Sequence, residues 1–228
     1  MNPLFLFLIL LTGVSWLIQQ RLRSKFQQYA QIHLRSGLSG REVAAKMLAD
    51  HGIRDVQIIS TKGQLTDHYD PTAKTVNLSA DVYAGRSATA AAVAAHECGH
   101  AVQHAEAYSF LQLRSALVPA LSSVSRVMPL LLFGGVMLLR VSLIPLGLGV
   151  ALFALATLFS FITLPVEFDA SRRALAWMDR SRVVTADEHA VAKDALWWAA
   201  MTYVVAAISS LATLLYYGSM LLGGNRRN

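Results

Sequence analysis

The segment Ser87–His100, SATAAAVAAHECGH, decides the fold of this chain. It contains neither proline nor glycine up to Ala95, and alanine is the strongest helix former. We therefore place His96 and His100 on one helix, where residues four apart lie on one face, one turn above the other. Both imidazoles can then reach a single metal ion, and Glu97 lies one step around the helix from His96.

This spacing is the H-E-x-x-H pattern, which is typical of zinc peptidases. We predict one Zn²⁺ ion, with His96 and His100 as metal ligands and Glu97 as the catalytic residue that holds a zinc-bound water. Two ordinary helix histidines with polar partners would give the same five letters. The prediction therefore depends on a third ligand elsewhere in the chain.

Zinc in a hydrolase usually has three protein ligands and one open position. His104 is eight residues from His96, about 12 Å along the helix axis, which is too far for one tetrahedral ion. The best candidate is the carboxylate of Glu167, which follows a long apolar stretch. It could instead be a helix N-terminal glutamate, placed just after Pro165 and favoured there by the helix dipole. The alternatives are two other acids of that region: Asp169 and Glu188.

The composition indicates a membrane protein. Hydrophobic residues make up 54% of the 228 residues and charged residues only 15%, against about 25% charged in an average soluble domain. The net charge of +6 fits Lys and Arg collected beside membrane spans. No basic run is interleaved with aromatics, so we expect no nucleic-acid partner. Cys98 is the single cysteine, which excludes an internal disulfide, and we interpret it as a small buried helix residue.

Apolar stretches predict about four transmembrane helices. Basic residues follow the first stretch rather than precede it, which indicates an uncleaved anchor with its N-terminus outside. A turn around Arg140 divides the middle apolar region into a hairpin of two spans, although one long span with a re-entrant piece is an alternative. The predicted spans are 3–18, 118–139, 143–165 and 196–222.

Two polar portions remain, and their Lys and Arg content places both in the cytoplasm. Residues 20–115 are expected to form a small zincin-like portion: a helix at 39–50, strands at 56–60 and 74–79, a loop at 80–86, and the histidine helix. The strand before that helix could bind an extended peptide at its edge. Residues 166–195 form the second portion, with the third zinc ligand and a helix that begins near Thr185.

The expected fold is therefore a mainly α membrane protein with about four transmembrane helices and a small α+β zincin-like portion that carries the HExxH helix. We expect a multi-pass protein of the cell membrane, the bacterial inner membrane, with its active site on the cytoplasmic side. The lipid bilayer is then one of its partners.

Three stretches together resemble the YugP-like zinc metallopeptidases of bacterial membranes and, more distantly, the HtpX and CAAX prenyl-protease group of gluzincins. They are TDHYDP at 66–71, VAAHECGHAVQ at 93–103 and PVEFDASRRAL at 165–175. The resemblance implies that Glu167 is the third zinc ligand. In the HtpX-like group an aspartate follows that glutamate by four residues, but this chain has Ser171 there. Ser171 or Asp169 is then expected to accept the N–H of a zinc-bound histidine.

We expect a membrane-bound zinc metalloendopeptidase that hydrolyses peptide bonds with a zinc-activated water and Glu97 as general base. Its substrates would be proteins or peptides, membrane proteins among them. One rival is a non-catalytic zinc-binding membrane scaffold or regulatory protein. Another is an intramembrane protease, which the alanine-rich character of the histidine helix disfavours. An oxyanion would need a further donor, and the candidates are His68, Tyr69, Tyr83 and His189.

Overall fold

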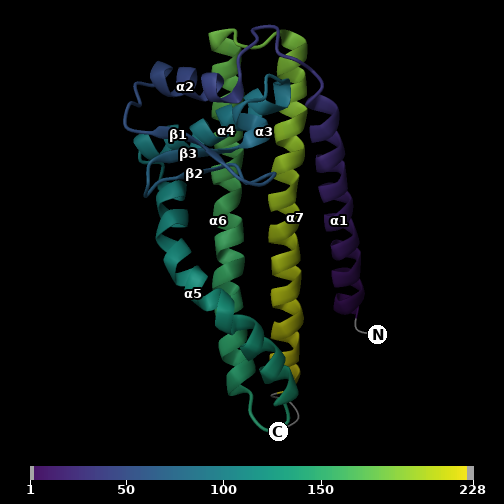
Figure 1. The fold of residues 1–228 in the computed structure, drawn as a ribbon. Coiled ribbons are helices and arrows are strands. Elements are labelled where there is room, and N and C mark those ends of the chain that lie inside the picture. Colours follow the sequence, from purple (N-terminus) through teal and green to yellow (C-terminus); the bar gives the residue numbers. More distant parts are fainter. Residues whose placement is uncertain (1–2, 225–228) are drawn as a thin grey trace. The chain divides into compact units, whose positions relative to one another are not determined.

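A computed structural model describes residues 3–224 of the chain (Figure 1). Four of its helices are long and apolar enough to cross a membrane, which confirms the mainly α membrane protein expected from the sequence. These helices are α1 (Pro3–Tyr29), α5 (Ser109–Met137), α6 (Ile144–Ser181) and α7 (Ala186–Gly224). The other elements are α2 (Gly40–Asp50), β1 (Gln57–Thr61), β2 (His68–Asp70), β3 (Thr75–Ser79), α3 (Ala80–Tyr83) and α4 (Ala88–Ala105).

The contacts divide the chain into two compact units. The first unit contains the described residues up to Leu17, residues Leu113–Leu164 and the described residues from Thr202 onward. Most of these residues belong to apolar helices. The second takes Ile18–Gln112 and Pro165–Met201, which includes the sheet and the histidine helix. Helices α6 and α7 contribute residues to both units.

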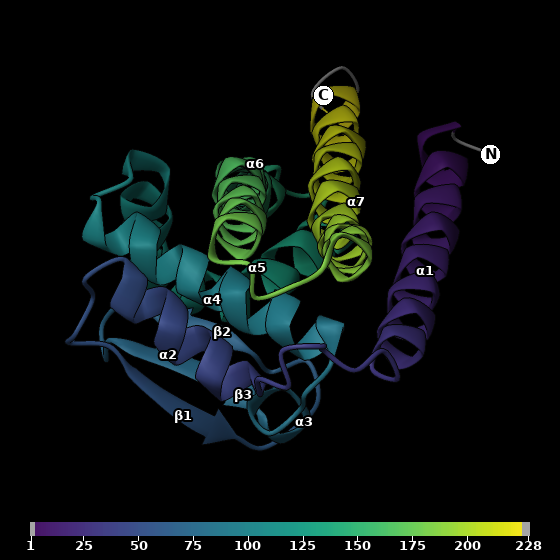
Figure 2. The same ribbon diagram turned by 90° about the horizontal axis from the view of Figure 1, so that it is seen from above.

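The sheet of the second unit has three strands in the order β1-β3-β2. Strand β3 pairs parallel with β1 and antiparallel with β2. Helices α2 and α4 cover one face of this sheet, as Figure 2 shows. Fully buried side chains of α2 and β3, among them Val43, Met47, Val76 and Leu78, join the alanines of α4 in one hydrophobic core. The alanine run therefore allows α4 to pack closely on its neighbours.

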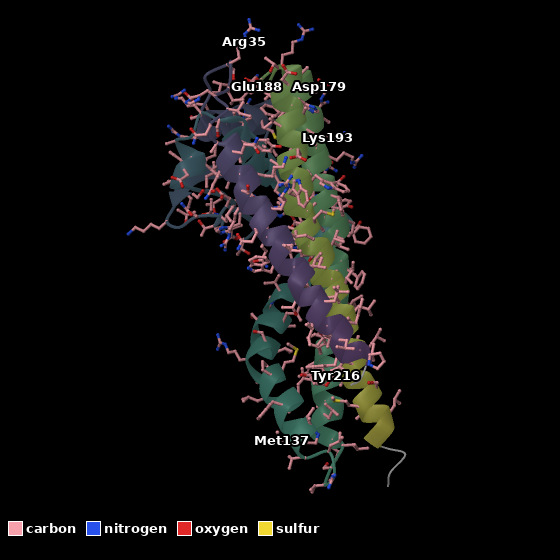
Figure 3. The ribbon with its side chains drawn as sticks, turned by 90° about the vertical axis from the view of Figure 1, so that its right-hand side faces the viewer. Arg35, Met137, Asp179, Glu188, Lys193 and Tyr216 are labelled. Carbon is pink, nitrogen blue, oxygen red and sulfur yellow. The ribbon has the colours of Figure 1, made fainter. Side chains whose placement is uncertain are left out.

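Three predicted helix starts are confirmed by their caps. Ser39 and Glu42 form a capping box at α2, and the Ser87 hydroxyl accepts the Ala90 N–H at the start of α4. Thr185 and Glu188 form a second capping box at α7: the Thr185 N–H donates to the Glu188 carboxylate, and the Glu188 N–H donates to the Thr185 hydroxyl. Glu188 also accepts the backbone N–H of Arg35 at 2.6 Å, and Figure 3 labels both residues. The Glu188 carboxylate therefore caps a helix and holds the segment at Arg35, and both are structural roles.

The structure corrects two details of the zincin-like portion. Residues 80–86, expected as a loop, begin with the short helix α3. The strand before the histidine helix, β3, lies in the middle of the sheet because β2 pairs with its second edge. It has no free edge for an added peptide, so that prediction was wrong. Strand β2 was missed because three residues are too few to show an alternating pattern.

The apolar hairpin is two helices, α5 and α6, joined by residues 138–143, and each is long and apolar enough to cross a membrane. A Cβ built on Gly135 would lie 2.4 Å from the backbone nitrogen of Leu146, which shows how closely the two helices approach. Pro165 lies inside α6 rather than before its start. Glu167 is thus a mid-helix residue, and its interpretation as a helix N-terminal glutamate was wrong.

Candidate metal centre

The second unit brings His96, His100 and Glu167 together. One nitrogen of each imidazole and one oxygen of the carboxylate all lie within 4.8 Å of one another. His96 Nε2 is 3.2 Å and His100 Nε2 is 3.7 Å from the same atom, Glu167 Oε2. Glu167 is only 2% exposed. Among residues 3–224 this is the one group of three or more His, Cys, Asp or Glu side chains with such spacing.

The spacing suits a zinc ion. Zinc takes nitrogen and oxygen ligands at about 2.0–2.2 Å in a tetrahedron, which places neighbouring ligand atoms about 3.3–3.6 Å apart. The two measured nitrogen–oxygen distances of 3.2 and 3.7 Å bracket that range closely. Two imidazoles and one carboxylate are also a ligand set found in zinc hydrolases, which keep a fourth position open. The residues present therefore fit one zinc ion.

Helix α6 can supply Glu167 because α4 has a glycine at the contact. A Cβ built on Gly99 would lie 2.6 Å from the carbonyl oxygen of Ala170. Real Cβ atoms do not come that close, so only glycine permits this approach of the two helix backbones. Gly99 lies between the two histidines in sequence, and Ala170 is three residues after Glu167. The same contact that packs the helices thus sets the distance across the site.

The contacts of Gln103 fix the tautomer of His100. The side-chain nitrogen of Gln103 donates to Val166 O at 2.8 Å and to Asp169 Oδ2 at 2.9 Å. Its oxygen therefore faces His100 Nδ1, 3.0 Å away, and Nδ1 must carry the proton. In a neutral imidazole Nε2 then holds a lone pair, and this lone pair faces the carboxylate of Glu167. Two acceptors facing each other call for a cation between them.

Asp169 belongs to the shell around the site rather than to the site itself. Besides Gln103, its carboxylate accepts bonds from Arg172 and, at 2.5 Å, from Arg173. Arg173 also donates to Glu106 at 2.6 Å. Gln103 is fully buried. A continuous chain of hydrogen bonds thus runs from His100 through Gln103 and Asp169 to a guanidinium group.

Ser171 contacts the other histidine. Its hydroxyl oxygen lies 3.1 Å from His96 Nδ1, so of the two residues expected to accept a histidine N–H, Ser171 is the one in direct contact with a histidine. Asp169 reaches His100 only through Gln103. Sequence reasoning missed Gln103, although its position gave a signal: a residue three places after His100 lies on the same helix face.

The other expected site residues lie as follows. Glu97 is buried on α4, 7% exposed. The thiol of Cys98 contacts Ala44 O, and burial raises its pKa, as suits an inert core residue. A hydrogen bond of 2.7 Å joins His104 Nδ1 to the Tyr69 hydroxyl. Burial raises the pKa of Tyr69 to about 12.

The remaining oxyanion candidates each have a contact outside the histidine pair. His68 Nδ1 lies 2.8 Å from Thr66 O, and His189 Nε2 lies 3.2 Å from Leu175 O. The guanidinium of Arg41 stacks on the Tyr83 ring. These contacts single out none of them as an oxyanion donor.

Comparisons with known proteins show which family this chain belongs to. The chain is 43% identical over 226 residues to "Putative membrane protease YugP" of Bacillus subtilis (strain 168), which covers 99% of this chain and 100% of that protein. No solved structure gave a significant match. Residues 4–222 match the model of a family described as "Putative neutral zinc metallopeptidase". With nearly its whole length matched, the chain belongs to this family of zinc metallopeptidases.

Proposed function

We propose that this chain is a membrane-bound zinc metalloendopeptidase of the gluzincin type. The observation that supports it best is the convergence of His96, His100 and Glu167 at tetrahedral spacing, with Glu97 next to His96 on the same helix. Its membrane-spanning helices and its family agree with this function. Helix α4 is not among the described helices that could cross a membrane, which disfavours an intramembrane site.

His96, His100 and Glu167 would hold one zinc ion, and the carboxylate would offset part of its charge. Bound zinc would supply a Lewis acid that lowers the pKa of water toward about 7 and polarises a carbonyl group. Glu97 would take a proton from the attacking water and deliver it to the leaving amine, a role worth about 10²–10⁴-fold in rate.

We further propose that the substrates are proteins or peptides, membrane proteins among them, and that nucleic acid is not a partner. The site would face the cytoplasm from a multi-pass protein of the bacterial inner membrane. Reporter fusions at Lys62, in the loop after β1, would test that side. A periplasmic reporter active at this position would place the site on the opposite face.

The catalytic part is tested with Glu97→Gln, which keeps the shape of the side chain and removes its basicity. Both the wild type and the variant are loaded with zinc, and cleavage of casein and of a membrane-protein substrate is measured. We expect the variant to lose about 10²–10⁴-fold in rate while it retains its zinc. Equal activity in both proteins, or none in either, would favour the non-catalytic scaffold instead.

The third ligand is tested with Glu167→Ala. Removal of the carboxylate leaves two histidines, and we expect the zinc content of the purified variant to fall below one ion per chain, with the helices intact by circular dichroism. Asp179→Ala is the matched control, since Asp179 is an exposed acid of the same helix, twelve residues beyond Glu167. Stoichiometric zinc in Glu167→Ala would move the third ligand to another residue.

A further inference from the structure

A groove of about 490 Å³ lies between α6 and α7 in the second unit. Its volume is within the roughly 300–1,000 Å³ usual for small-molecule sites. Most of the floor is apolar, with Phe168, Leu175, Leu196, Trp197 and Ala200. Ser171, whose hydroxyl lies 3.1 Å from His96 Nδ1, also lines the groove. Phe168 and Trp197 are exposed although they are large and apolar. Exposed apolar side chains gathered in one groove favour the binding of an apolar ligand.

The groove straddles the boundary between apolar and charged sequence. Residues 144–166 of α6 and residues 195–224 of α7 contain no Asp, Glu, Lys or Arg. The charged residues begin directly beyond, and three of them, Arg172, Lys193 and Asp194, line the groove. Tryptophan is enriched where membrane spans meet water. The groove therefore lies where the apolar part of α7 meets charged residues of both helices.

The charged end of the groove is positive. Lys193, labelled on α7 in Figure 3, has no acidic partner among residues 3–224. The Arg172 side chain donates to Asp169 but is 76% exposed, so most of its guanidinium faces solvent. The one acid in the wall, Asp194, is already bound by Lys25 at 2.9 Å and by the Tyr29 hydroxyl at 2.5 Å. An anionic group could thus bind here without repulsion.

We propose that this groove binds one anionic phospholipid. Its phosphate would lie against Lys193 and Arg172, and one acyl chain would cover the apolar floor past Trp197. A phospholipid suits the groove better than a peptide does. The apolar side chains of the floor offer no hydrogen-bond partners to the N–H and C=O groups of a peptide backbone, whereas an acyl chain has no such groups to satisfy.

Ser171 joins the groove to the metal centre, but lipid binding can be tested without the peptidase activity, because it is measured directly and not through cleavage. Basic pockets between membrane helices bind anionic headgroups, and each Lys or Arg near a membrane surface contributes about fivefold in affinity. We therefore expect phosphatidylglycerol to bind about 20- to 30-fold more tightly than phosphatidylcholine, since two cations face the phosphate.

The test uses the full-length protein, delipidated in detergent and titrated with each lipid under native mass spectrometry. We expect one phosphatidylglycerol per chain at low lipid concentration. Lys193→Gln should weaken this binding about fivefold. The matched control is Arg23→Gln, which removes an exposed cation of α1 that does not line the groove and should leave the first lipid bound as in the wild type.

Four outcomes would overturn the proposal. Equal affinity for both lipids would show that charge does not matter, and equal losses in the two variants would show that binding is not at the groove. Inorganic phosphate that displaces the lipid at similar concentration would mean a headgroup site without an acyl chain. An apolar peptide that competes more strongly than phosphatidylglycerol would make the groove a peptide-binding site. Because no readout depends on cleavage, an inactive protein would not affect the result.

Discussion

Substitution of Gly99 by alanine should damage the metal centre without touching a ligand. The new Cβ would lie 2.6 Å from Ala170 O and 3.1 Å from the Ala170 carbonyl carbon, all of them backbone atoms that cannot rotate away. Ordinary contact begins at 3.4 Å, so α4 and α6 must separate locally by roughly 0.8 Å, given how densely interiors are packed. Zinc ligand distances tolerate only about 0.2 Å.

Two effects on stability oppose each other at this position. Alanine is favoured over glycine inside a helix by about 0.5–1 kcal/mol, whereas overpacking of a tight interface costs about 1–3 kcal/mol. Overpacking wins, and we expect a net loss of about 1–2 kcal/mol. The displacement of Glu167 from His96 and His100 should lower zinc affinity by about 10- to 100-fold, as removal of supporting contacts around metal ligands does.

The assay is zinc affinity by competition with a chromophoric chelator, together with thermal unfolding in detergent. Gly134→Ala is the matched control, because it is also a helical glycine but has no neighbouring atom within 4 Å of its built Cβ. It should keep the wild-type zinc affinity. A Gly99→Ala protein with wild-type affinity and an unchanged unfolding midpoint would refute the reasoning that this contact sets the geometry.

Two further predictions concern residues outside the ligand set. Gln103→Leu leaves the Nδ1 proton of His100 without an acceptor, so zinc affinity should fall about 10- to 100-fold; an unchanged affinity by the same competition assay would remove Gln103 from the metal centre. The Trp177 indole donates to Asp50 and lowers the pKa of that carboxyl, so its stabilisation is present above the unfolded pKa of about 3.9 and lost as the pH falls through the folded value. Asp50→Asn should therefore lower the free energy of unfolding at pH 7 by no more than about 1 kcal/mol, because the Asp50 side chain is 40% exposed. The difference from wild type should vanish in acid, and a difference that persists at the lowest pH would contradict this.

The features that the sequence predicted depend on residues close together in the chain. The capping pairs Ser39–Glu42 and Thr185–Glu188 are three residues apart, and His96 and His100 are four apart. At such spacing helix geometry alone decides which side chains meet. The spans were predictable for a related reason, since about 20 apolar residues in a row have few alternatives to a membrane helix.

Features that depend on contacts between distant residues were not predictable from local patterns. The resemblance to known peptidases implied that Glu167 joins the histidines, and the structure places it there, but spacing alone left Asp169 and Glu188 open. What decides among them is the packing of Gly99 on Ala170, 71 residues away in the chain. The pairing of β2 with β3 is equally non-local, and a three-residue strand gives no periodic signal of its own.

The role of Gln103 follows from the geometry of α6. Ser171 is four residues after Glu167 and so shares its face, which allows its hydroxyl to reach His96. Asp169 is two residues after Glu167, about 200° around the helix, so its carboxylate points away from the imidazoles. A buried amide can bridge this gap, because it donates to the carboxylate with one end and accepts from His100 with the other. A chain with serine at position 171 can thus still couple a carboxylate to its metal-binding histidine, provided that an amide occupies position 103.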